Sequence, residues 1–195
     1  VSFSLLLIIS LGLTTMAGCS GATGKIKVGV VQLVEHPALD ASYQGFVDAL
    51  KDAGYVDGDK ITISYQNGQG EQANCQTIAT QFLNEKMDLI LAIATPAAQA
   101  AANVIKDIPI LVTAVTDPQD AKLVKTNASP GGNVSGTSDL TPVKEQFDLM
   151  KKLLPDVKKV AVLYTSSESN SVFQANLAKS AAAALGIEVI EATVS

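Results

Sequence analysis

The sequence is poor in the residues that carry most metal and redox chemistry. Its 195 residues include two Cys, one His and no Trp. Two Cys cannot form a disulfide-rich scaffold, and a single His argues against a His-based zinc site and leaves little room for a Ser-His-Asp triad. Basic residues are also few, with 14 Lys and Arg against 19 Asp and Glu. Nucleic-acid-binding proteins usually carry a basic surface, so this acidic composition argues against one.

Several motifs that mark enzymes are missing as well. The sequence contains no G-x-S-x-G nucleophile elbow, no H-E-x-x-H pair and no P-loop. The glycines in 68–70 follow the second expected strand rather than the first, so they do not form the phosphate-binding turn of a dinucleotide fold. We therefore expect neither an enzyme nor a cofactor-dependent protein, and no metal site.

Charge is absent from residues 1–18, of which 3–13 are strongly apolar. That apolar run matches the h-region of a signal peptide and is too short to span a membrane. Small residues then precede Cys19, as in a lipoprotein lipobox, although Met16 stands where Leu is usual and no basic segment precedes the run. We expect a lipoprotein signal peptide over 1–18, lipidation at Cys19 and a flexible tether over 19–24. A plain secretory signal with an incidental Cys is the alternative.

The remaining chain alternates between short apolar runs and segments of helical periodicity. Strands are predicted over 27–33, 60–65, 88–94, 109–115, 133–138, 159–164 and 187–192. Helices are predicted over 39–53, 71–86, 96–106, 142–154 and 169–185. Near-continuous apolar strands separated by helices indicate parallel sheets covered on both faces, so the predicted fold class is α/β.

A stretch rich in Pro, Gly and Asn at 127–133 separates two such series. We assign 25–132 to a first lobe and 133–195 to a partial second lobe. The last strand is not followed by a covering helix. We therefore expect the second lobe to be truncated and the chain to be the N-terminal part of a longer protein.

Ligands of open parallel sheets bind beyond the carboxyl ends of the strands. Hydroxyls, short acids and helix N-termini follow five of the predicted strands here. Helix N-termini attract anions, whereas carboxylates receive ammonium groups, so this set suits a zwitterion such as an amino acid. For any one of these residues plain N-capping is the simpler explanation, and the recurrence over five strand ends is what supports a site. The predicted ligand-binding residues are Glu35, His36, Thr95, Pro96, Thr116, Asp117, Ser138, Asp139, Ser166, Glu168, Ser169 and Asn170.

His36 has two open interpretations. It either lines the pocket as a neutral donor or stacking face, or it is an ordinary residue of a surface loop. No nucleophile motif accompanies it, which argues against a role as catalytic base.

Four segments, 30–40, 88–101, 113–118 and 163–171, closely resemble the TrpX/YckB-like group of ABC-transporter substrate-binding proteins. The resemblance implies a periplasmic-binding-protein type I fold with two Rossmann-like lobes. It also implies lipid anchoring in Gram-positive bacteria and delivery of a solute to a membrane permease. Some members of the group bind tryptophan or other aromatic amino acids. Complete members are longer and cross between their lobes three times, whereas only one crossing is present here.

The resemblance also implies roles for individual residues. Thr95 and the helix after it would meet the ligand carboxylate. The other cleft-lining residues that the group's motifs indicate are Thr116, Asp117, Ser166, Glu168 and Asn170.

The sequence thus predicts an extracytoplasmic solute-binding lipoprotein of an ABC importer that binds an amino acid between its lobes. Its expected partners are the small ligand, the ABC permease and, through the lipid anchor, the membrane, with no nucleic acid and no cofactor. One alternative is the ligand-binding domain of a membrane sensor. A less favoured alternative is an α/β hydrolase that uses Ser166 and His36.

Overall fold

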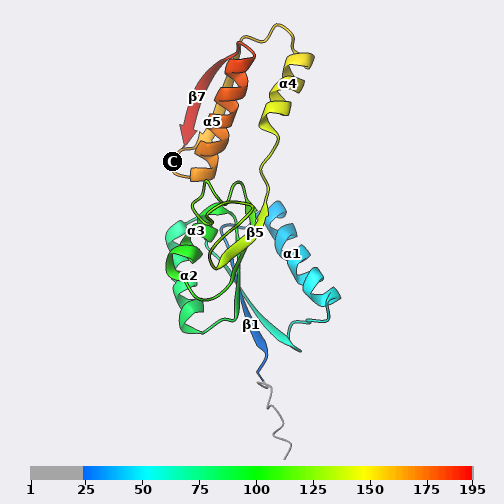
Figure 1. The fold of residues 1–195 in the computed structure, drawn as a ribbon, viewed down its shortest axis with the longest axis vertical. Coiled ribbons are helices and arrows are strands. Elements are labelled where there is room, and N and C mark those ends of the chain that lie inside the picture. Colours follow the sequence, from blue (N-terminus) through cyan, green and yellow to red (C-terminus); the bar gives the residue numbers. More distant parts are fainter. Residues whose placement is uncertain (1–23, 195) are drawn as a thin grey trace, which may run out of the picture.

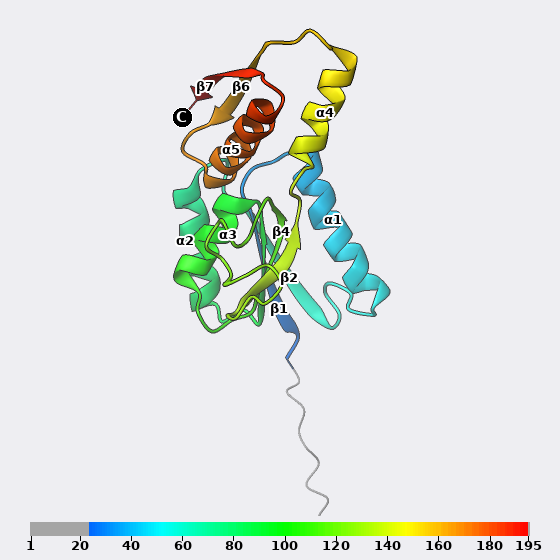
Figure 2. The same ribbon diagram turned by 45° about the horizontal axis from the view of Figure 1, so that its top comes forward.

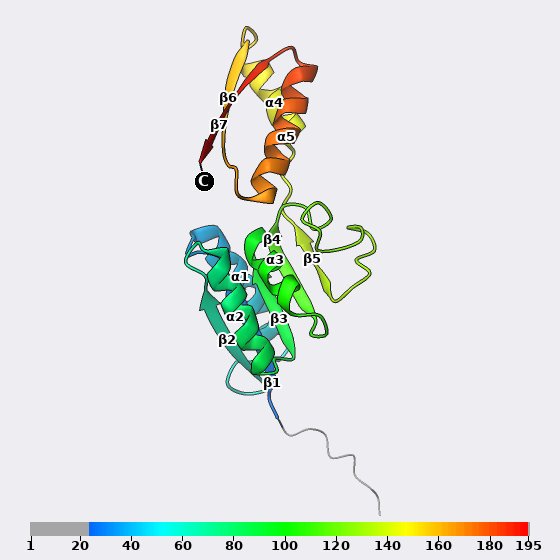
Figure 3. The same ribbon diagram turned by 90° about the vertical axis from the view of Figure 1, so that its left-hand side faces the viewer.

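The structure, a computed structural model, describes residues 24–194, and the chain forms two lobes stacked along its long axis (Figure 1). The first lobe contains a five-stranded sheet and the second a two-stranded sheet. One segment, 139–142, connects the two lobes (Figure 3). The predicted signal peptide, Cys19 and all of the tether except Gly24 lie outside the described residues.

The first sheet is parallel throughout and has the strand order β2-β1-β3-β4-β5. Its strands are β1 (Ile26–Gln32), β2 (Ile61–Asn67), β3 (Leu89–Ile93), β4 (Ile110–Val115) and β5 (Val134–Ser138). The β1 and β3 registers pair Gln32 with Ile93, so both strands end at the same level.

Helices cover both faces of this sheet, as the apolar strand sequences predict. On one face α1 (Pro37–Asp52) packs over a cluster that includes Val28, Val30, Leu91 and Ile93. On the other face lie α2 (Gln72–Asn84) and α3 (Thr95–Val104), whose core includes Phe82 and Ile90 (Figure 2). Burial on both faces explains why β1 and β3 read as continuous apolar runs rather than alternating ones.

The second lobe is more open. Its parallel strands β6 (Lys159–Thr165) and β7 (Glu188–Val194) pack against α5 (Ser169–Ala184), and α4 (Val143–Leu153) lies beside α5. Half-buried and exposed positions alternate along most of β6, in which Leu163 is 70% exposed, whereas β7 is exposed at nearly every position. In residues 24–194 this sheet has helices on one face only (Figure 3).

The predicted boundary between the lobes is wrong by one strand. We assigned 133–138 to the second lobe, but β5 pairs with β4 in the first sheet. A Pro- and Gly-rich loop therefore connects two neighbouring strands of one lobe instead of separating two lobes. The remaining elements occur in the predicted order, and the α/β fold class with parallel sheets is confirmed.

Among residues 24–194, no helix has the length and apolar character needed to cross a membrane.

Candidate functional site

The candidate site lies where the two lobes meet. Because the first sheet is parallel, the carboxyl ends of its strands share one edge, and this edge faces the second lobe (Figure 3). The N-terminal half of α5 approaches the same edge. Gln99 Nε2 donates a hydrogen bond to Ser169 Oγ at 3.2 Å, and Gln174 Nε2 donates to Thr116 Oγ1 at 3.4 Å. The boundary between the lobes therefore brings predicted residues of both lobes together.

Thr95 is the predicted binding residue whose surroundings at this edge fit a ligand best. β3 ends at Ile93, Ala94 adopts a φ of +83°, and α3 begins at once with Thr95. The Thr95 side chain is only 2% exposed, yet its Oγ1 has no hydrogen-bond partner among the described residues. The first amides of a helix also lack acceptors within the helix and lie at the positive end of its dipole. Pro96 is buried at the second position, where a missing amide costs nothing.

Thr116, Ser138 and Asp139 come together at the ends of β4 and β5. Ser138 Oγ donates to the Thr116 carbonyl oxygen at 2.6 Å and accepts from the Leu140 amide at 3.2 Å. The Asp139 amide donates to the Val115 carbonyl oxygen. These bonds fix the start of the connecting segment to the first sheet, so Ser138 acts structurally in this arrangement.

Asp117 uses its carboxylate within its own loop. Its Oδ1 accepts from the amides of Gln119 and Asp120 at 2.9 Å and from Asn127 Nδ2 at 3.1 Å. Burial raises the pKa of the Asp117 carboxyl, but the hydrogen bonds from Asp120, Asn127 and Gln119 outweigh it and hold the pKa below its usual range. Three donors on one carboxylate oxygen stabilise the loop, as expected from the capping alternative.

Glu35 and His36 lie in the exposed loop between β1 and α1. His36 Nδ1 accepts from the Ala38 amide at 3.2 Å, so this imidazole caps α1. Glu35 borders an open hollow of about 700 Å³ at the carboxyl ends of β1 and β2. The other residues around this hollow are Val34, Asp40, Tyr65, Asn67 and Gln69.

The predicted residues of the second lobe have different surroundings. Ser166 Oγ donates to the Val194 carbonyl oxygen at 3.2 Å, and one carboxylate oxygen of Glu168 accepts from Ser171 Oγ at 3.4 Å. Asn170 has a buried Oδ1 without a partner in the described part of the chain. Ser166 Oγ bonds to the end of β7 and His36 Nδ1 to the start of α1, so the described residues show no nucleophile–base pair of the kind that the hydrolase alternative needs.

Gln32 was missed in the sequence, although it is the most buried polar residue at this edge. It is 0% exposed, and its Nε2 donates to the Val34 carbonyl oxygen at 2.9 Å and to Asp40 Oδ1 at 2.7 Å. Both neighbours are acceptors, which fixes the orientation of the amide. Its Oε1 has no partner within residues 24–194. Its position as a polar residue at the end of an apolar strand could have identified Gln32 as a candidate site residue from the sequence.

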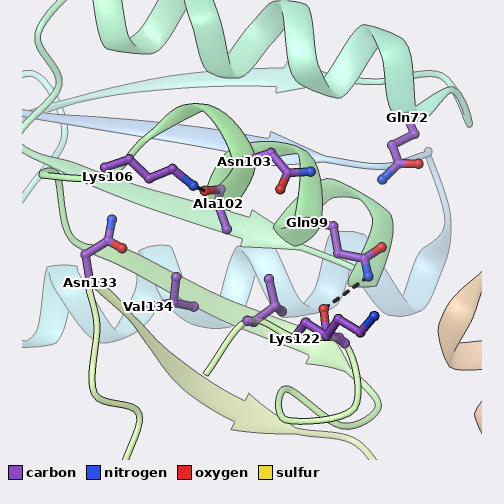
Figure 4. Close-up of a pocket in the computed structure, with 10 residues that line it drawn as sticks. Gln72, Gln99, Ala102, Asn103, Lys106, Lys122, Asn133 and Val134 are labelled. Atoms are coloured by element: carbon purple, nitrogen blue, oxygen red, sulfur yellow. Dashed lines mark hydrogen bonds between the residues drawn. The ribbon is translucent and has the colours of Figure 1, made fainter. Parts of the chain in front are cut away.

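A second hollow, of about 440 Å³, lies on the flank of the first lobe between α3 and the segment before β5 (Figure 4). Lys106, Lys122, Asn103 and Gln99 line it, and Gln99 Nε2 donates to the Ala121 carbonyl oxygen at its border. Of the residues predicted to bind ligand, none lines this hollow. Within residues 24–194, no three His, Cys, Asp or Glu side chains gather to hold a metal ion.

The chain matches one family model and a relative of known ligand. A family model described as "ABC transporter substrate binding protein" matches residues 27–195. A tyrosine-binding protein of Clostridioides difficile (strain R20291) is 45% identical over 206 residues, which cover 98% of this chain and 60% of the relative.

Two solved structures are similar as well. An ABC domain from Streptococcus pneumonia in complex with L-Trp is 43% identical and has a TM-score of 0.83, with 88% of this chain and 58% of that chain covered. A substrate binding protein with adhesive properties from Clostridium difficile, in its ligand-free, open structure, is 49% identical with a TM-score of 0.69, covering 87% and 58%.

The chain thus spans about 60% of the length of the relatives that it matches. The type I periplasmic-binding-protein fold implied by the resemblance is confirmed by these structures. The matching family consists of substrate-binding proteins rather than enzymes. This chain belongs to the family of ABC transporter substrate binding proteins.

Proposed function

We propose that the protein is an extracytoplasmic solute-binding lipoprotein of an ABC importer and that it binds an aromatic amino acid between its lobes. The similarity to a tyrosine-binding protein and to an L-Trp complex, both above 40% identity, is the observation that carries this proposal. Closure of the lobes around the solute would shield it from water and present a closed form to the permease.

The start of α3 supplies the recognition of the amino acid's carboxylate. A carboxylate placed there would accept a hydrogen bond from Thr95 Oγ1 and interact with the first helical amides. Without a ligand, the buried hydroxyl is left unpaired at a cost of about 1–3 kcal/mol. Binding of any group that accepts this hydrogen bond would remove that cost, and the positive end of the α3 dipole favours an anionic acceptor.

The aromatic ring of the ligand requires an apolar or aromatic wall. The chain has no Trp, but Tyr65 borders the hollow at the ends of β1 and β2 and packs against Tyr43, with ring centroids 4.7 Å apart and ring planes tilted by 39°. Burial, followed by the Asp57 and Tyr65 charges, raises the pKa of the Tyr43 phenol, so this ring stays neutral at physiological pH. Because Tyr65 borders this hollow, we assign its ring as an aromatic surface for the ligand side chain.

Calorimetric titration of the complete protein tests the ligand class. Tyrosine and tryptophan should bind, and tyramine, which lacks the carboxylate, should bind at least tenfold more weakly. Thr95→Val should weaken tyrosine binding by roughly tenfold or more, because a hydrogen bond to a charged group contributes about 1.5–3 kcal/mol. The variant should leave the weak binding of tyramine unchanged. Absence of heat with every amino acid would refute the proposed ligand class.

Anchoring is tested separately. The lipobox-like sequence before Cys19 predicts that the protein sediments with membranes and that Cys19→Ala releases it into the medium or the soluble fraction. A wild-type protein found only in the soluble fraction would contradict the lipoprotein assignment while leaving amino-acid binding intact.

A further inference from the structure

Two glutamine side chains join the lobes beside the proposed ligand site. Gln99 lies in α3 and donates to Ser169 Oγ, at the first position of α5, across 3.2 Å. Gln174 lies in α5 and donates to Thr116 Oγ1, just after β4, across 3.4 Å. The two bonds therefore run in opposite directions, one from each lobe to a hydroxyl of the other.

Each glutamine is also held within its own surroundings. The same Gln99 nitrogen donates to the Ala121 carbonyl oxygen at 3.2 Å, as Figure 4 shows. The Gln174 Oε1 accepts from Thr141 Oγ1 of the connecting segment at 3.3 Å. Because these bonds do not involve the opposite lobe, they position both side chains before the lobes meet, and less conformational freedom is lost on contact.

The arrangement of the lobes is more similar to that of the L-Trp complex than to that of the ligand-free, open structure. The TM-score is 0.83 against the L-Trp complex and 0.69 against the ligand-free, open structure, although the open structure shares more sequence identity and similar coverage. In residues 24–194 one segment joins the lobes, so rotation about 139–142 would separate Gln99 from Ser169 and Gln174 from Thr116.

We propose that Gln99 and Gln174 are positioning residues that form a polar latch. The latch consists of the bonds Gln99–Ser169 and Gln174–Thr116, through which the two glutamines stabilise the closed arrangement. The apparent dissociation constant equals the intrinsic one divided by the fraction of protein in the binding-competent state. A latch that raises this fraction therefore strengthens binding of the solute. This inference rests on the proposed function for its effect on affinity, whereas its effect on closure is independent of the ligand.

Energy transfer between two dyes measures closure in the complete protein. The dyes are placed on cysteines that replace Lys51 in α1 and Lys152 in α4, both exposed, while the native Cys75 is buried. Without ligand, Gln99→Ala and Gln174→Ala should each lower the closed fraction. Each variant should weaken tyrosine binding by roughly three- to tenfold, the effect of losing one ordinary hydrogen bond.

A double-mutant cycle separates the latch from direct ligand contact. If Gln99 acts through Ser169, then Gln99→Ala combined with Ser169→Ala should weaken binding little more than either change alone. Ser169→Thr keeps the accepting hydroxyl, so its closed fraction should be that of the wild type rather than that of Ser169→Ala. Should Gln99→Ala fold poorly, Ser169→Ala and Thr116→Val remove the same bonds while leaving both glutamines in place.

The matched control is Gln76→Ala, on the exposed face of α2, which should change neither closure nor affinity. Unchanged energy transfer in both latch variants, or fully additive effects of Gln99→Ala and Ser169→Ala, would overturn the latch. If no amino acid binds the wild-type protein, the proposed function fails, and the energy transfer without ligand still decides whether the latch exists.

Discussion

The two lobes share one rhythm of strands and helices but differ in how they are held together. In the first lobe, helices cover both faces of the sheet, and the buried residues form two clusters. In the second lobe, β6 and β7 have one helical face, and large apolar side chains stay exposed, among them Ile190 at 51%. Within residues 24–194, a similar alternation of strands and helices therefore gives a core covered on both faces in one lobe and a sheet covered on one face in the other.

Ion pairs show the opposite distribution. The ion pairs found among residues 24–194 all lie in the second lobe: Lys144–Asp148, Lys159–Glu188 and Lys179–Glu191. Exposed pairs of this kind contribute about 0–1 kcal/mol each, whereas a buried apolar side chain contributes about 1.5–3 kcal/mol. Within the described residues, the first lobe should thus be the more stable unit.

The largest expected effect comes from the first-lobe core. Phe82 is completely buried and packs against Gly29, whose missing side chain makes room for the ring. Phe82→Ala should cost about 3–5 kcal/mol of unfolding free energy, because it removes transfer energy and leaves a cavity. Leu163→Ala in the second lobe should cost less than about 0.5 kcal/mol, since its side chain is 70% exposed.

Hydrogen exchange with mass spectrometry, together with denaturant unfolding, measures both variants segment by segment. Protection in β1, β3 and α2 should fall for Phe82→Ala and persist for Leu163→Ala. Equal losses of stability in Phe82→Ala and Leu163→Ala would show that the two lobes are packed alike, contrary to the difference in cover described above.

The next effect concerns the strand that the sequence assigned to the second lobe. A Cβ at Gly136 would overlap the carbonyl oxygen and amide of Val112 in the neighbouring strand. Gly136→Ala should therefore cost about 1–3 kcal/mol and reduce exchange protection in β4 and β5. Gly132→Ala, where nothing lies within 4 Å of the added carbon, is the matched control. If Gly136→Ala reduced exchange protection in β6 instead of β4, the assignment of β5 to the first lobe would be wrong.

The order of strands and helices could be predicted from the sequence because hydrophobic periodicity is a property of each segment. Strand partners and polar contacts depend on residues far apart in the chain and could not be predicted in this way. The segment 133–138 was correctly predicted to be a strand, but its own residues do not state which sheet it joins. The site residues divide in the same way. Thr95 follows the apolar strand β3 directly, so its position at the sheet edge follows from local pattern.

Gln99 and Gln174 could not be predicted from such patterns. Both lie inside helices, and what distinguishes them is a partner about 60–70 positions away, Ser169 for Gln99 and Thr116 for Gln174. Asp117 and His36 carry binding chemistry by residue type, yet they bond to their own loops, and only three-dimensional contacts distinguish these two uses.

A smaller effect tests whether polar contacts also stabilise the first lobe. Asp117→Asn keeps an accepting oxygen but removes the charge that three donors stabilise. The variant should cost roughly 1 kcal/mol at neutral pH, because the loop is partly solvated and loses a charged cap. The folded-state pKa is lowered, so this contribution is fully present above the ordinary aspartate pKa.

It is lost as the pH falls through the folded-state value, and wild type and variant should converge in acid. Denaturant unfolding between pH 3 and pH 7 measures the difference. The control is Asp156→Asn, at an exposed position of the second lobe. Its difference in unfolding free energy from the wild type should not change over this pH range. A constant difference between wild type and Asp117→Asn over the whole range would mean that the charge of Asp117 does not stabilise its loop.

The smallest effect is expected in the second lobe itself. Lys159 and Glu188 face each other in the β6–β7 register, with Nζ and a carboxylate oxygen 2.9 Å apart and side chains 61% and 58% exposed. Glu188→Gln should cost less than about 0.5 kcal/mol at low salt, since both groups are well solvated, and nothing measurable at 1 M salt, where the Debye length is about 3 Å. Exchange protection of β6 and β7 at both salt concentrations measures the change, with Glu145→Gln in α4 as the exposed control. A loss above about 1 kcal/mol that persists at high salt would show that this pair holds the two strands together, and that the second lobe depends on its charges as the first depends on its core.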